Sequence, residues 1–227
     1  MLPMTAAHSA LLIIDVQYLD AHPDYGTLAH ARELGLSDSY TYYTERLQDL
    51  VIPNIQRLQA SFRQHGMEVV HVHIESLTTS GRERGWLYRT LAIGAPRGSR
   101  EAEILPEVAP VGDELVIAKT SSSPFNSTNI DVMLRNLGIE QLVLVGVMTS
   151  GCVESTARDA ADRGYDVILV TDACAARTPE MEQKTHEAIG GTFVHLLTTD
   201  EVLDLVGDVA HGGDTNEKGA RQTALAR

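Results

Sequence analysis

The sequence predicts an α/β fold in which a parallel sheet is covered by helices. Six short apolar runs, rich in β-branched residues, are nearly continuous rather than alternating, which is typical of strands buried on both faces. Segments of helical period lie between them, and strands that alternate with helices form a doubly wound sheet. With 227 residues and 43% hydrophobic content, the chain suffices for one core. We expect one domain over residues 1–207 and a polar tail over 208–227.

The expected elements follow from these patterns in chain order. The strands are predicted at residues 10–14, 68–74, 115–118, 142–147, 166–170 and 192–197. The helices are predicted at residues 44–65, 129–137, 152–163, 179–189 and 198–206. A glycine follows each of the first four helices, as is common after a helix C-terminus. Pro53 predicts a kink in the first helix, and Thr198 and Glu201 have capping-box spacing before the last one.

Two long segments interrupt this alternation. Residues 18–43 form a polar, tyrosine-rich insertion, and residues 77–111 hold many Gly, Pro and Arg residues without a clear period. Loops of this length in a compact domain are usually functional lids or oligomer contacts. The second segment holds five arginines, of which one or two could bind a carboxylate or a carbonyl, but for any single one a solvated or interface role is favoured: Arg82, Arg84, Arg89, Arg97 and Arg100.

Charge and cysteine content restrict the partners and the compartment. The net charge of −13 makes a nucleic-acid partner improbable, because such a partner requires a basic face. The N-terminus carries no Lys or Arg before an apolar stretch that is too short for a signal peptide or a membrane span. The two cysteines, Cys152 and Cys174, suit a reducing compartment. We therefore expect a cytoplasmic protein with no membrane partner, and a structural role for Cys174.

Three chemically active residues follow strands that are expected to end at one edge of the sheet. Asp15 follows the first strand, Lys119 the third, and Cys152 the turn after the fourth. Ligands of open α/β sheets bind at this edge. A carboxylate can take the thiol proton, and an ammonium group stabilises both anions. Asp15 alone could cap a loop and Lys119 alone could be a solvated charge, but three such residues at equivalent strand ends predict a catalytic centre.

Cys152 lies where a helix is expected to begin. The partial positive charge of a helix N-terminus favours a thiolate, and the free N–H groups there can hold an oxyanion. The backbone N–H groups of Met148 and Cys152 are the candidates for that oxyanion hole. The alternative is a small buried hydrophobic cysteine, which is the commoner role of this residue type.

Three segments around these residues resemble the signature segments of the isochorismatase-like cysteine hydrolases. They are LIIDVQ at 12–17, KTSSSPFNST at 119–128 and GVMTSGCVESTARD at 146–159. The resemblance extends from about residue 10 to residue 206. It implies a three-layer α/β/α, Rossmann-like fold with a six-stranded parallel sheet, a catalytic triad of Asp15, Lys119 and Cys152, and a cis peptide bond before Met148. It also implies a homodimer or homotetramer.

The cysteine favours one chemistry within this family. Isochorismatases cleave a vinyl ether and generally lack it, so Cys152 indicates C–N cleavage through a thioester. The metal motif of nicotinamidases is absent, since His22 and Asp24 stand in the wrong order. His71 and His73 share a strand face without a third ligand, and we interpret them as sheet residues. We expect no metal and no cofactor.

The run from Cys152 to Asp159 resembles most the ureido-cleaving members, which hydrolyse N-carbamoylsarcosine, ureidoacrylate, biuret or triuret. The expected substrate is a small amide or ureido compound. The candidate substrate contacts are Gln17, Trp86, Phe125, Asn126 and Thr149.

Other readings stay open at this point. A nicotinamidase-like or lactam-opening hydrolase is an alternative, as is a thiol redox, sensor or binding protein, although no Cys-x-x-Cys pair exists. A nucleotide-binding Rossmann protein is disfavoured because no Gly-x-Gly-x-x-Gly follows a strand.

Overall fold

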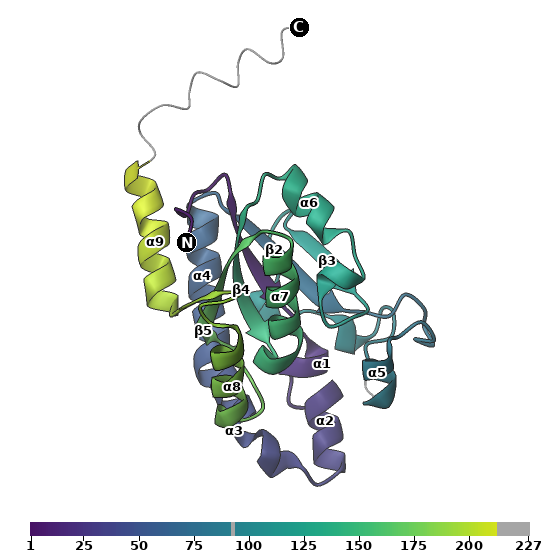
Figure 1. Cartoon of the computed structure of the whole chain (residues 1–227). Helices are drawn as coiled ribbons and strands as arrows, with labels where there is room; N and C mark the ends of the chain where they lie inside the picture. Colours follow the sequence, from purple (N-terminus) through teal and green to yellow (C-terminus); the bar gives the residue numbers. More distant parts are fainter. Residues whose placement is uncertain (92–93, 213–227) are drawn as a thin grey trace, which may run out of the picture.

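A single sheet of six parallel strands forms the centre of the protein (Figure 1). The computed structural model describes residues 1–91 and 94–212. The spatial order of the strands is β3-β2-β1-β4-β5-β6. Their bounds are β1 Ser9–Ile14, β2 Glu68–Ile74, β3 Leu115–Lys119, β4 Gln141–Val147, β5 Asp166–Ala175 and β6 His195–Leu197. The predicted parallel sheet is confirmed, although β5 is longer and β6 shorter than expected.

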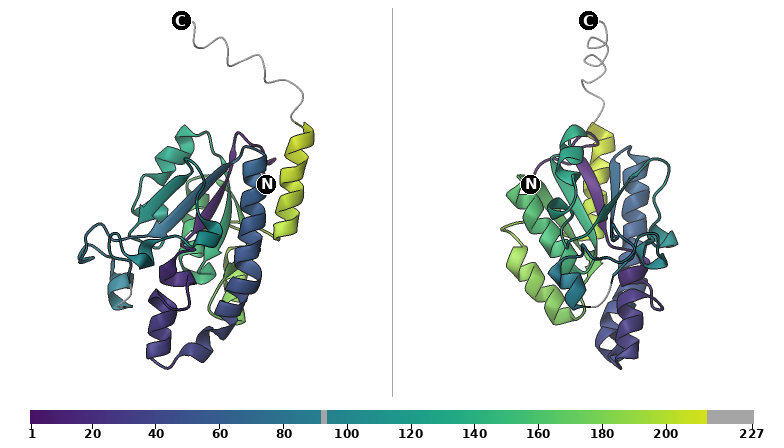
Figure 2. Two further views of the ribbon diagram at one scale, coloured as in Figure 1. Left: turned by 180° about the vertical axis from the view of Figure 1, so that it is seen from behind. Right: turned by 90° about the vertical axis from the view of Figure 1, so that its right-hand side faces the viewer.

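Helices cover both faces of the sheet, which gives the expected three layers (Figures 1 and 2). Helices α4 (Ile52–Gln64) and α9 (Thr199–Gly212) pack on one face, while α6 (Ile130–Asn136), α7 (Glu154–Asp162) and α8 (Pro179–Ile189) pack on the other. Successive residues of β4 enter opposite cores, Val143 with α4 and Leu144 with α7. This double burial is the reason that the strand sequences are continuously apolar.

The first long helix contains a widened turn rather than a simple proline kink. It consists of α3 (Thr41–Arg46), a π-helical turn (Leu47–Val51) and α4, and the N–H of Ile52 donates to the carbonyl of Leu47. Pro53 follows at once and has no N–H to offer. The π turn therefore lies where proline would disturb the regular α-helical ladder.

The segment at 18–43 is helical, contrary to the expectation of a long loop. It folds into α1 (Tyr18–Ala21), α2 (Gly26–Glu33) and a 3-10 turn (Ser37–Tyr40) before α3. The Tyr43 side chain is part of the core, and its hydroxyl donates to the carbonyl of Asp20 at 2.7 Å. The polar composition concealed this packing, because the tyrosines bury their rings and keep polar contacts.

The segment at 77–111 is largely irregular, as expected, with one short helix, α5 (Trp86–Thr90), and 3-10 turns at Arg100–Ala102 and Pro106–Val108. Figures 1 and 2 show that α1, α2 and α5 lie at the end of the molecule opposite the last turn of α9. Both interrupting segments therefore gather at the sheet edge that carries Asp15 and Lys119.

The C-terminal helix runs further than predicted. Thr198 and Glu201 form the expected capping box, in which the Thr198 N–H donates to the Glu201 carboxylate at 2.7 Å. Helix α9 continues to Gly212, so the boundary expected at 207 falls inside it. The rest of the expected tail, 213–227, lies outside the described residues. Within the described ranges, no helix has the length and apolarity needed to cross a membrane.

Candidate active site

Asp15 and Lys119 are placed by the ends of two strands that both pair with β2. Asp15 directly follows β1, and its N–H donates to the carbonyl of Val72 at 2.9 Å. Its φ of 55° is unusual for a residue other than glycine, and such conformations are concentrated at functional sites. Lys119 is the last residue of β3. Both side chains are fully buried, so their charges have to be compensated within the protein.

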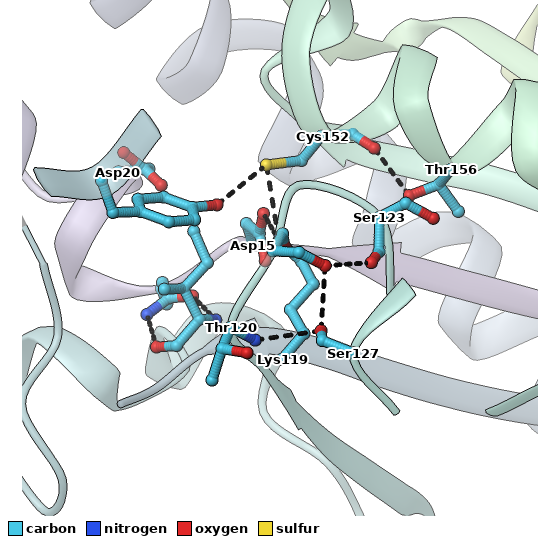
Figure 3. Close-up of polar contacts among 12 residues, drawn as sticks. Asp15, Asp20, Lys119, Thr120, Ser123, Ser127, Cys152 and Thr156 are labelled. Atoms are coloured by element: carbon cyan, nitrogen blue, oxygen red, sulfur yellow. Dashed lines mark hydrogen bonds and ion pairs between the residues drawn. The ribbon is translucent and has the colours of Figure 1, made fainter. Parts of the chain in front are cut away.

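The Lys119 ammonium connects the carboxylate and the thiol. Its Nζ lies 2.8 Å from Asp15 Oδ2 and 3.4 Å from Cys152 Sγ, and it donates to the carbonyl of Ser121 at 3.0 Å. Figure 3 shows Asp15 and Lys119 on the same side of the Cys152 sulfur. The three residues that the sequence predicts at neighbouring strand ends are therefore in contact.

Cys152 lies in a π-helical turn (Thr149–Val153) that precedes α7, and this turn is kinked at Gly151, whose φ of −132° and ψ of −105° are not helical. The expected cis peptide bond is present between Val147 and Met148. Gly146 has a φ of 116°, and a Cβ at this position would lie 2.1 Å from the carbonyl oxygen of Ile14. Only glycine therefore allows β4 to approach β1 closely enough to bring Cys152 over Asp15.

Electrostatics keep Cys152 in the thiol form. Burial and the neighbouring Asp15 carboxylate raise the pKa of Cys152 to about 12, against a lowering effect of Lys119. The helix start favours a thiolate in the sequence, whereas burial and Asp15 shift the thiol pKa in the opposite direction. A base has to remove the proton when the thiol attacks.

Asp15 is poised to be that base. Burial raises its pKa above the ordinary value, against the lowering effect of Lys119. Burial alone would lower the pKa of Lys119, but Asp15 and Cys152 raise it. The resting site is thus an Asp15–Lys119 ion pair beside a neutral thiol, and a carboxylate with a raised pKa accepts a proton more readily.

A cavity of about 590 Å³ opens above the thiol. Met148 and Cys152, the two expected oxyanion-hole residues, are in its lining. Most of its wall comes from α1, α2, the following 3-10 turn and α5. The lining residues are Asp20, Thr27, His30, Ala31, Leu34, Leu36, Tyr40, Ile74, Leu87, Tyr88, Thr90, Leu91, Ser122, Met148, Ser150, Gly151 and Cys152. The two interrupting segments therefore form the walls of the pocket.

Tyr88 and Asp20 are polar residues of this pocket that the sequence did not predict. The Tyr88 hydroxyl lies 3.7 Å from Cys152 Sγ, and Asp20 accepts a hydrogen bond from the Thr27 hydroxyl at 2.7 Å. Burial raises the pKa of Asp20 to about 6. Neither residue belongs to a motif or a period, and only the position of their segments after β1 and β2 could have pointed to them.

None of the five expected substrate contacts, all of which lie in the described ranges, lines this pocket. Gln17 is fully buried, where its amide accepts from the N–H of Ile74 and donates to the carbonyls of Ile74 and Glu101. It ties the end of β1 to β2 and to the 77–111 segment. Trp86 is 77% exposed, and its neighbours Leu87 and Tyr88 face the cavity instead.

The other three expected contacts lie on the face of the sheet that α6, α7 and α8 cover. Phe125 packs in the core on the α6 and α7 face, and Asn126 donates to Asp159 at 2.9 Å. Thr149 is fully buried and donates to Glu182 Oε1 at 2.7 Å. Their proximity in sequence to Lys119 and Cys152 brought these residues into consideration, but their side chains contact the helices on that face of the sheet.

Glu182 fixes the turn that carries the thiol. Its Oε1 accepts from Thr149, and its Oε2 accepts a short hydrogen bond from the N–H of Ala176 at the end of β5. Arg46 lies 3.9 Å from Oε2. This buried carboxylate therefore links α8, β5 and the π-helical turn, and it holds the first residue of that turn in place.

The histidines of β2 are engaged in the fold, as expected. His71 Nε2 pairs with Glu114 at 3.1 Å, and His73 Nδ1 lies 2.8 Å from the carbonyl of Ala102. Over residues 1–91 and 94–212, no group of three or more His, Cys, Asp or Glu side chains is arranged to hold a metal ion.

Comparison with known proteins identifies the relatives of this chain. Residues 9–201 match the isochorismatase domain. An N-carbamoylsarcosine amidase from Arthrobacter sp. is 29% identical over 175 residues, which is 75% of this chain and 66% of that protein, just under two thirds of its length. The ureidoacrylate amidohydrolase RutB from Enterobacter sp. (strain 638) is 28% identical over 78% of this chain and 79% of its own.

Solved structures show the same fold. A cysteine hydrolase from Pseudomonas syringae pv. phaseolicola superimposes with a TM-score of 0.76, over 92% of this chain and 97% of that chain, at 23% sequence identity.

Proposed function

The chain belongs to the isochorismatase domain family, and on that premise we propose that it is a cysteine-dependent amidohydrolase. It hydrolyses a non-peptide C–N bond of a small amide or ureido compound through a thioester and releases ammonia or an amine. One observation carries the proposal: Lys119 Nζ lies 2.8 Å from Asp15 and 3.4 Å from Cys152, beneath a cavity sized for a small molecule. The amidase and amidohydrolase among the relatives support the C–N chemistry.

The first half of the reaction forms the thioester. Asp15 takes the proton from the Cys152 thiol as the sulfur attacks the substrate carbonyl, and Lys119 stabilises the negative charge that moves between them. The N–H groups of Met148 and Cys152 receive the oxyanion of the tetrahedral intermediate. Asp15 then returns the proton to the leaving nitrogen, the C–N bond breaks, and the acyl group stays on sulfur.

The second half releases the acid. Asp15 accepts a proton from a water molecule, whose oxygen attacks the thioester carbonyl, and the C–S bond breaks with return of a proton to sulfur. The sum is one amide and one water converted to one acid and one amine. The high thiol pKa makes this base obligatory, since little thiolate exists before attack.

We further propose that the enzyme works as a cytoplasmic homodimer or homotetramer without a cofactor, as the family resemblance implies. Size-exclusion chromatography with light scattering tests the assembly. A monomer at micromolar concentration would contradict it.

The decisive experiment for the function is an ammonia-release screen of the protein and its Cys152→Ser variant over ureido acids, biuret-type compounds, primary amides and nicotinamide. We expect turnover by the wild type and a loss of at least a hundredfold in the variant. Equal turnover by the two proteins would overturn the nucleophile. Peroxide consumption with a thiol reductant, without ammonia release from any amide, would favour a redox role instead.

A further inference from the structure

The pocket above Cys152 has mostly apolar walls. Its described lining contains the aliphatic side chains of Leu34 and Leu36 after α2, Ile74 at the end of β2, and Leu87 and Leu91 of the α5 region. Such walls favour a hydrocarbon substituent on the carbonyl that reaches the thiol. A site of this kind gains its selectivity from the few polar groups set into the walls.

Asp20 is the charged group that these walls leave open to the cavity. Its Oδ1 accepts from the Thr27 hydroxyl at 2.7 Å, and its carbonyl accepts from Tyr43 at 2.7 Å, so both ends of the residue are fixed. No described residue donates a hydrogen bond to its Oδ2, although Asp20 lines the cavity. Figure 3 shows Asp20 in the same cluster as Cys152 and Asp15. This carboxylate oxygen is accessible from a largely apolar pocket, where a donor on the ligand can bond to it.

The ammonium group of Lys119 is already engaged with groups of the protein. Lys119 Nζ contacts Asp15, Cys152 and the carbonyl of Ser121, and it is fully buried. No Lys or Arg is among the described residues that line the cavity, and the histidine there, His30, lies 3.6 Å from the carboxylate of Glu33. Four arginines of the 77–111 segment are exposed outside it: Arg82, Arg89, Arg97 and Arg100. An anionic substrate would therefore place a further negative charge beside Asp15 and Asp20 without a cation to receive it.

We propose that Asp20 selects the substrate: the pocket accepts amides or ureido compounds with an apolar body and a cationic or hydrogen-bond-donating end, and rejects those that carry a carboxylate. This inference rests on the proposed function and narrows its substrate class. It departs from N-carbamoylsarcosine and ureidoacrylate, the substrates named for two relatives, because both of those compounds are carboxylic acids.

The test uses three five-carbon amides that differ only at the far end: 5-aminopentanamide, pentanamide and glutaric acid monoamide. Their binding to the Cys152→Ala variant is measured by calorimetry at about 0.15 M salt, where long-range attraction to the acidic protein is screened. Binding does not require turnover, so it tests the pocket separately from the reaction. Ammonia release by the wild type from the same amides tests the proposed function.

We expect 5-aminopentanamide to bind at least tenfold more tightly than glutaric acid monoamide, with pentanamide between them. Adding Asp20→Asn, which preserves shape and the Thr27 contact, should reduce that ratio to threefold or less. The matched control is Asp24→Asn, which removes an exposed carboxylate on the same segment that pairs with Arg32 outside the cavity, and it should leave the ratio unchanged. Thr27→Val removes the bond to Oδ1 but keeps the charge, so the preference should persist in it.

Equal or tighter binding of glutaric acid monoamide would overturn the inference. So would a tenfold ratio that survives Asp20→Asn, or the absence of measurable binding by all three amides. A clear cation preference without ammonia release from any amide would refute the hydrolase proposal and leave the selectivity of the pocket intact.

Discussion

Replacing Lys119 with methionine removes the ammonium group that pairs with the buried carboxylate of Asp15, while keeping a side chain of similar length. Two unit charges 2.8 Å apart attract each other by about 6 kcal/mol at an effective dielectric constant of 20. Desolvation of both groups offsets much of this, but removal of one partner leaves a buried charge without compensation. We therefore expect the free energy of unfolding to fall by about 3–5 kcal/mol.

Thermal unfolding followed by circular dichroism measures this loss. For a chain of this size, 1 kcal/mol corresponds to a shift of about 2–4 °C in Tm, so Lys119→Met should unfold roughly 10 °C below the wild type. The control is Arg32→Met, which breaks a 3.1 Å ion pair with Asp24 whose side chains are 58% and 64% exposed. Because exposed pairs contribute at most about 1 kcal/mol, its Tm should move by less than about 4 °C.

The double variant Asp15→Asn/Lys119→Met separates the ion pair from other effects of the substitution. Removing both charges leaves no uncompensated ion, so the double variant should lose less stability than the two single variants combined, by at least about 2 kcal/mol. Strict additivity, or a Tm of Lys119→Met within 3 °C of the wild type, would refute the reasoning. Lys119→Met should also lower kcat by about a hundredfold or more, since the developing thiolate loses its cation.

Three further outcomes follow from the site. Asp15→Asn should speed the alkylation of Cys152 by iodoacetamide at pH 8.5 several-fold, because Asp15 helps to raise the thiol pKa to about 12. The same variant should slow ammonia release by about 10²–10⁴-fold, because it lacks the base. Slower alkylation, followed by mass spectrometry, would contradict this. In Glu182→Gln, the amide NH₂ group has to face one of two donors, the Thr149 hydroxyl or the buried N–H of Ala176. Urea titration should therefore show that the free energy of unfolding falls by about 1–3 kcal/mol. Asp20→Asn should stabilise the protein relative to the wild type increasingly from pH 4 to 7.

The sign of the Asp20 effect follows from proton binding. Burial raises the pKa of Asp20 from its ordinary value of 3.8 to about 6, so between these values the folded chain holds a proton that the unfolded chain has lost. Stability from this group is present below about pH 4 and is lost as the pH rises through 6. A Tm difference between wild type and Asp20→Asn that stays constant from pH 4 to 7 would show that the carboxyl is not perturbed.

A matched control accompanies the Glu182 variant. Glu187→Gln changes an exposed carboxylate on the same helix, which accepts a hydrogen bond from the side chain of Gln183. It should alter the free energy of unfolding by less than about 0.5 kcal/mol. Equal losses in the two variants would show that the contacts of Glu182 with the π-helical turn do not matter.

The local sequence by itself determined the layers and the convergence of Asp15, Lys119 and Cys152 at one edge of the sheet. Short, continuous apolar runs rich in β-branched residues, such as Leu142 to Val147, are typical of strands buried on both faces, and their alternation with helices favours a parallel sheet. Parallel strands end at one edge, so the residues that follow them, Asp15, Lys119 and Cys152, had to converge there. This argument needs only the chain order and the period of the side chains, and both are visible in the sequence.

Only the tertiary structure decided the pocket. Its walls come from Leu34, Tyr88 and other residues of two segments that have no period, and their direction depends on packing between elements far apart in the chain. For the same reason Gln17 and Thr149 turned out to be tethers, although both lie next to the triad. The pKa of the thiol is likewise a tertiary property, because it is raised by burial and by the Asp15 carboxylate, and both depend on elements far apart in the chain.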